Sequence, residues 1–186
     1  MLDRRALLAL CGLMGGAATV GLLTWPRKAL GFGPVTLGQA RTAALTDLGP
    51  GFLAEELCSG QLGVLYSVRD PGFITADNDA IPVMAMFGKM SDRVSEISAS
   101  LSWPNGGMSF KDWGKLVLAQ EAEVGRRTGA SPRTAAALED DIAVETSREF
   151  KRQDAIVTLR SRWMRRSGAT FSRVHLLATG EASVIV

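Results

Sequence analysis

The feature that most constrains this chain is an uncharged apolar run close to its N-terminus. Ala6–Trp25 is twenty residues without a charge, and a helix of that length rises about 30 Å, the thickness of a bilayer core. Arg4 and Arg5 precede the run, and Arg27 and Lys28 follow it. A basic start, an apolar run and a polar exit are typical of a targeting segment. We therefore predict a signal segment or membrane anchor over residues 1–30 and a folded domain over residues 31–186.

The beginning of the chain resembles a twin-arginine export signal. Arg4 and Arg5 are followed by one free position and then by Leu7 and Leu8. Such signals serve proteins that fold, or join a folded partner, before export. No Ala-x-Ala cleavage motif follows the apolar run, so a cleaved signal and an uncleaved anchor both stay open. In either case we expect the domain to lie in the periplasm or to face it from the membrane.

The composition favours a helical domain. The chain is 46% hydrophobic and 22% charged, which is typical of a folded protein and not of a disordered one. Aromatic residues are sparse, at 6%, whereas alanine, leucine and methionine, which favour helices over strands, are frequent. We predict a mainly α fold, in which the N-terminal helix precedes a compact domain of about five helices.

Apolar spacing and chain breakers place the helices of this domain. Val83, Met86, Met90, Val94 and Ile97 recur every three or four residues, as on one face of a helix. The expected helices cover Leu37–Thr46, Phe52–Val68, Pro82–Leu101, about 109–127 and about 131–166.

Three stretches of the chain carry further local signals. Ser109 and Asp112 resemble a capping box at the start of the fourth helix. Ala155–Met164 could instead be a strand, because Ile156 and its two successors are β-branched. The stretch Phe171–Ala178 is either a short helix or a strand.

The candidates for catalysis and metal binding are few. His175 is the single histidine, and we interpret it as a core or interface residue. With Cys58 as the only cysteine of the body, zinc lacks ligands. Asp77–Asp79 is followed neither by the glycine nor by the distal glutamate of a calcium loop, and no glycine-rich nucleotide loop occurs. We therefore predict a protein that is not an enzyme and holds no cofactor or metal.

A basic segment near the C-terminus is the best candidate for a partner interface. Between Arg148 and Arg173 the chain has eight basic and two acidic residues. Trp163 lies among several of these arginines, a composition that is common at interface hot spots. We predict a partner interface that includes Trp163, Arg160 and Arg166, with core packing as the alternative for Trp163. Nucleic acid is not an expected partner, because an exported protein rarely meets it.

The closing stretch of the chain contains Asp154–Val157, followed by Trp163, Ser167, Thr170, Arg173 and Leu176. This pattern resembles the C-terminal end of small subunits of bacterial membrane-bound sugar and alcohol dehydrogenases. Residues 31–129 do not match. The resemblance implies a helical, non-catalytic subunit with a twin-arginine signal, which accompanies a flavin-bearing large subunit and a cytochrome subunit.

From these observations we expect a non-catalytic accessory subunit of an exported or membrane-bound oxidoreductase complex. Such a subunit would stabilise or escort its catalytic partner. The alternative is a membrane-anchored structural or assembly protein of another envelope complex. An uncleaved N-terminal segment would make the membrane itself a further partner.

Overall fold

A computed structural model of the chain describes residues 29–56, 61–70, 72–73, 80–103 and 107–179. In this part of the chain there are two helices and ten strands. A short hairpin comes first, formed by β1 (Gly31–Phe32) and β2 (Val35–Thr36), and the helix α2 (Arg41–Leu48) follows it. The remaining eight strands form one sheet.

The sheet consists of two antiparallel meanders, each preceded by a helix. The first meander follows α2 and contains β3 (Phe52–Glu56), β4 (Leu62–Val68), β5 (Ile81–Phe87) and β6 (Val94–Trp103). The second follows the helix α3 (Phe110–Thr128) and contains β7 (Arg133–Glu139), β8 (Ala143–Lys151), β9 (Ala155–Met164) and β10 (Thr170–Ala178).

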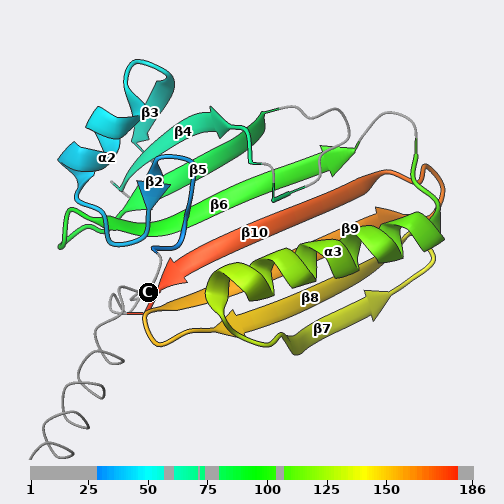
Figure 1. Ribbon diagram of the computed structural model, residues 1–186. Helices are drawn as coiled ribbons and strands as arrows, with labels where there is room; N and C mark the ends of the chain where they lie inside the picture. Colours follow the sequence, from blue (N-terminus) through cyan, green and yellow to red (C-terminus); the bar gives the residue numbers. More distant parts are fainter. Residues whose placement is uncertain (1–28, 57–60, 71, 74–79, 104–106, 180–186) are drawn as a thin grey trace, which may run out of the picture.

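The last strands of the two meanders pair with each other in the middle of the sheet. The strand order is β3-β4-β5-β6-β10-β9-β8-β7, and every pairing is antiparallel. Figure 1 shows α3 lying along β8 and β9, with the β1–β2 hairpin near β6. Both meanders thus belong to one continuous sheet.

The core lies on one face of this sheet, and one row of paired residues shows its composition. The row crosses from β3 to β8 through positions that face each other on neighbouring strands. Its members are Phe52, Tyr66, Val83, Ala99, Val174, Leu159 and Arg148. Tyr66, Val83, Ala99, Val174 and Leu159 are buried. Phe32 from β1 and Val124 from α3 line a small apolar cavity on this face together with Val157 and Val174. We call this the covered face.

The prediction of a mainly α domain of about five helices is wrong. The expected helix Phe52–Val68 is the strand pair β3–β4, and Pro82–Leu101 is β5 and β6. The long helix expected over 131–166 is the meander β7, β8 and β9. The strand alternative for Ala155–Met164 is confirmed, and Phe171–Ala178 lies in β10.

The apolar stripe that suggested a helix comes from two separate strands. In β5, Ile81, Val83, Ala85 and Phe87 are buried, and the residues between them are not. This period of two is that of a half-buried strand. Met90, a member of the expected stripe, lies in the β5–β6 turn and is fully exposed.

One predicted helix is confirmed together with its cap. Ser109 precedes α3, and its hydroxyl accepts a hydrogen bond from the backbone N–H of Asp112 at 3.1 Å. The hydroxyl also donates to the Asp112 carboxylate, which holds the pKa of that carboxyl below its ordinary value. At the other end Gly129 has φ +66°, the left-handed conformation that glycine adopts at helix ends. The shorter helix expected over Leu37–Thr46 is observed four residues later at its start, as α2 over Arg41–Leu48.

Candidate binding surface

The face of the sheet opposite the covered face carries polar and exposed apolar side chains. A second row of paired residues, one position along each strand from the core row, crosses all eight strands on this side. Its members are Leu53, Leu65, Met84, Ser98, His175, Thr158, Glu149 and Arg133. None of these residues is buried. We call this side the open face, because no described helix or hairpin packs against it (Figure 1).

Strand alternation brings three arginines together at the centre of the open face. Arg160 and Arg162 are two residues apart on β9, so both point to the same side of the sheet. Arg173 on β10 stands directly opposite Arg160. All three side chains are exposed. We call Arg160, Arg162 and Arg173 the basic part of the open face.

The placement of Arg173 brings no evident benefit to the fold. Like charges in opposed positions of neighbouring strands destabilise a sheet, and Arg160 and Arg173 are such a pair. Arg160 is compensated by an ion pair with Glu145. Arg173 makes no ion pair with any residue in the described ranges. Its charge is therefore available to a ligand.

A hollow of about 790 Å³ lies over the basic part, and its lining carries both signs of charge. The ionisable residues along it are Glu96, Glu145, Arg160, Arg162, Arg173 and His175. The Nε2 atom of His175 lies 2.8 Å from Oε1 of Glu96. Both glutamates of the lining thus have a basic partner within it, whereas Arg162 and Arg173 form no ion pair with a residue that the structure describes.

The open face becomes apolar toward the β3 edge. Leu53, Leu65, Met84 and Met86 lie on this face of β3, β4 and β5, together with Ser67 and Pro82. Leu53 is 69% exposed and Leu65 38% exposed. Large apolar side chains grouped at the surface of a protein are typical of interaction sites. We call Leu53, Leu65, Met84 and Met86 the apolar part of the open face.

The predicted interface residues are divided between the two faces. Arg160 belongs to the open face. Trp163, three residues further along β9, lies on the covered side, where its Nε1 donates a hydrogen bond to the carbonyl of Met108 at 2.7 Å. Its ring is 5.2 Å from that of Phe110. Arg166 is exposed in the turn after β9. The structure thus does not bring Trp163 and Arg160 together.

Several residues of the open face did not enter the predicted interface. Arg162, Arg173, Leu65 and Met84 were missed because a helical reading distributes them around a helix. The signal that would have found part of the face is a spacing of two, as in Arg160-x-Arg162 and Arg173-x-His175. His175, predicted to be a core or interface residue, lies half-buried in the hollow.

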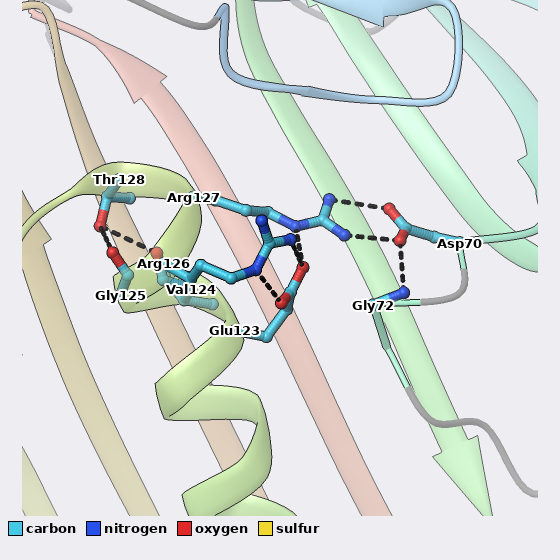
Figure 2. Close-up of polar contacts among 8 residues, drawn as sticks. All are labelled: Asp70, Gly72, Glu123, Val124, Gly125, Arg126, Arg127 and Thr128. Atoms are coloured by element: carbon cyan, nitrogen blue, oxygen red, sulfur yellow. Dashed lines mark hydrogen bonds and ion pairs between the residues drawn. The ribbon is translucent and has the colours of Figure 1, made fainter.

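A second polar cluster, at the C-terminal end of α3, stabilises the fold (Figure 2). Glu123 accepts hydrogen bonds from Arg126 and Arg127. The bond from Arg126, acting against partial burial and aided by Arg127, lowers the pKa of Glu123 to about 2. Burial acts to lower the pKa of Arg127, but its hydrogen bonds to Asp70 and Glu123 raise it overall. A Cβ atom at Gly72 would overlap Oε1 of Glu123, so a larger residue there would displace the carboxylate from its position in the cluster.

Some predicted features lie outside the described residues. These are the export signal with Arg4 and Arg5, Cys58, and the polar segment Asp77–Asp79. Within the described residues, no group of three or more His, Cys, Asp or Glu side chains is arranged to hold a metal ion.

Neither of the two described helices has the length and apolar character needed to cross a membrane. No family model, curated protein or solved structure matched the chain.

Proposed function

We propose that this chain is a non-catalytic accessory protein that holds a partner protein against the open face of its sheet. The observation that carries the proposal is the contrast between the two faces. On the covered face Val83 and Leu159 are buried, whereas Leu65 and Arg160 on the open face are exposed. A sheet of this kind usually buries one face and solvates the other with polar residues. Here the solvated face also carries large apolar side chains and uncompensated charge.

The dimensions of the open face favour a protein over a small molecule. Eight strands spaced about 4.8 Å apart make the face roughly 34 Å wide. A face of that width and a few residues of strand length approaches the ~800 Å² that each partner contributes to a standard protein interface. The hollow is lined by residues of β6, β10, β9 and β8, so a small molecule there would leave the apolar part uncovered.

The compartment and the partner class in this proposal come from the sequence. The arginine pair and apolar run support a periplasmic or membrane-anchored location. The resemblance of the closing stretch to dehydrogenase small subunits supports a flavin-dependent large subunit as the partner. The helical fold that this resemblance implied does not enter the proposal, because the chain forms a sheet.

Photo-cross-linking in intact cells tests the proposal. A benzophenone amino acid replaces Phe171, an exposed aromatic residue of the open face, and a control replaces Leu118, an exposed residue of α3. We expect one discrete protein adduct from position 171 and none of that mass from position 118. Mass spectrometry then identifies the partner. An equal adduct from both positions, or no protein adduct from position 171, would contradict the proposal.

A further inference from the structure

The two parts of the open face follow a fixed order across the strands. The apolar part lies on β3, β4 and β5, and the basic part lies on β9 and β10. Between them, β6 contributes Glu96, Ser98 and Ser100 to this face. Ser98 stands opposite Met84 on one side and His175 on the other. The face is therefore polarised along a line perpendicular to its strands.

Building on the proposed function, we propose that the partner lays a single segment across the strands along this direction, and that the segment is acidic at one end and apolar at the other. The segment places carboxylates over the basic part and large apolar side chains over the apolar part. Three spacings of about 4.8 Å separate β4 from β10, which is roughly 14 Å. A partner helix of about ten residues, with a rise of 1.5 Å per residue, covers that distance.

Charge complementarity identifies the acidic end of the segment. Arg160 and Arg173 stand opposite each other, and Arg162 follows two positions along β9. A guanidinium binds a carboxylate with two parallel hydrogen bonds, which makes arginine the preferred partner of an acidic side chain. A carboxylate placed at Arg173 would also relieve the repulsion between the two opposed arginines.

The apolar end is identified by side-chain type. Met84 and Met86 alternate with buried residues along β5, and Leu65 stands beside Met84 on β4. Methionine is unbranched and adapts to irregular partners, and it is frequent at surfaces that bind apolar helices. This end therefore fits leucine-like or aromatic side chains of the segment.

The mixed charge of the hollow favours a protein segment over an anionic membrane. Glu96 and Glu145 line the same hollow as the arginines. Each of these glutamates lies beside a basic residue of the same lining, Glu145 beside Arg160 and Glu96 beside His175. The positive charge left without such a partner in the hollow is therefore confined to Arg162 and Arg173. Two localised guanidinium groups fit the discrete carboxylates of a protein segment better than the continuous charge of an anionic lipid surface.

Mapped cross-links from two positions test this inference on the full chain in its own cells. A benzophenone amino acid replaces Met84 in one variant and Phe171 in another. We expect both to reach one segment of one partner. The residues reached from position 171 should be flanked by Asp or Glu, and those reached from position 84 should lie among large apolar residues.

Reversing the charge of Arg173 provides a second measurement, the yield of the adduct, which does not require the cross-linked residues to be identified. In the chain with the cross-linker at position 84, Arg173→Glu should lower the adduct yield at least tenfold, since breaking a hydrogen-bonded charge pair at an interface has effects of that size. The matched control is Lys111→Glu on α3, an exposed residue of the covered side, which should leave the yield unchanged. An acidic-to-lysine change in the mapped segment should restore the yield of Arg173→Glu. If thermal unfolding shows that Arg173→Glu does not fold properly, Arg173→Gln is used in its place.

The outcomes separate this inference from the proposed function. A single partner segment that lacks acidic residues, or an unchanged yield with Arg173→Glu and Arg173→Gln, overturns the inference and leaves the open face as a protein-binding surface. Adducts with lipid alone, or no protein adduct at all, overturn both.

Discussion

Arg127, in the last turn of α3, holds both carboxylate oxygens of Asp70, the residue two positions after β4. Its Nη1 donates to Oδ2 at 2.8 Å and its Nη2 to Oδ1 at 2.5 Å. The same guanidinium lies over the ring of Phe73, 4.6 Å from its centroid. Because Asp70 belongs to the first meander and Arg127 to the helix of the second, this pair fastens the two halves together on the covered face.

We expect Asp70→Asn to lower the free energy of unfolding by about 1–3 kcal/mol, since it removes a two-bond charged partner from a mostly enclosed arginine. The side chains of the pair are only 24% and 10% exposed. The matched control is Asp92→Asn, which breaks the more exposed pair with Arg41 and should change stability by less than about 1 kcal/mol. Equilibrium urea unfolding measures both. Equal effects from the two substitutions would show that the Arg127–Asp70 pair does not fasten the halves.

The depressed pKa of Glu123 predicts a loss of stability in acid. The carboxyl has a pKa of about 2 in the folded protein against 4.5 ordinarily, so between these values the unfolded chain binds more protons than the folded one. The contribution of Glu123 is complete above pH 4.5 and is lost as the pH falls toward 2. Melting temperatures measured from pH 7 to pH 2 should fall less steeply in Glu123→Gln than in the unchanged protein. Parallel pH profiles would contradict this assignment.

Met90 in the turn between β5 and β6 and Ile97 in β6 are expected to respond in opposite ways to substitution. Met90 is fully exposed and Ile97 fully buried. Met90→Asp should change the free energy of unfolding by less than about 0.5 kcal/mol, as is usual at a surface. Ile97→Ala should lower it by about 2–5 kcal/mol, through lost burial and a cavity. Urea titrations followed by far-ultraviolet circular dichroism measure both effects. A large loss of stability from Met90→Asp would favour a helix over Pro82–Leu101 instead of the two strands.

These residues also explain why the sequence indicated helices where strands form. Helices and strands differ in period, but Met84 and Met86 place apolar residues on the open face of β5 between the buried positions. Because both faces of β5 carry apolar residues, the polar–apolar alternation of a strand is not visible in the sequence. Apolar residues can then be selected at a spacing of three or four, which suggests a helix. Alanine and methionine strengthened that reading through their helix propensity, which tertiary pairing overrides. The helix α3 was predictable because its cap depends only on local contacts between Ser109 and Asp112.

The candidate site was predictable only in part for the same reason. Arg160 was named because it lies in a basic stretch of sequence. Arg173 became its neighbour only through the register of β9 and β10, which no local pattern in one sequence fixes. The apolar part of the open face comes from a distant stretch of the chain. It lies on the same sheet as the arginines only because β6 pairs with β10.

The separation of Trp163 from Arg160 gives a test that distinguishes packing from binding. Trp163 is half-buried, donates to the Met108 carbonyl and packs edge-on against Phe110. Trp163→Ala should therefore lower the free energy of unfolding by about 2–3 kcal/mol, somewhat below the loss for a fully enclosed ring. Arg160→Gln removes an ion pair between a 63% exposed arginine and a 14% exposed Glu145. Glutamine keeps a hydrogen-bond donor for that carboxylate, so the loss of stability should be about 1 kcal/mol and smaller than that of Trp163→Ala.

Partner binding should show the reverse order, because Arg160 belongs to the open face and Trp163 does not. With the cross-linker at position 171, Arg160→Gln should reduce the partner adduct in a fully folded protein. Trp163→Ala should reduce it only in proportion to the fraction of unfolded chain, which urea unfolding measures independently. If Trp163→Ala abolishes the adduct while leaving the unfolding curve unchanged, Trp163 contacts the partner directly, and the interface extends around the edge of the sheet to the covered side.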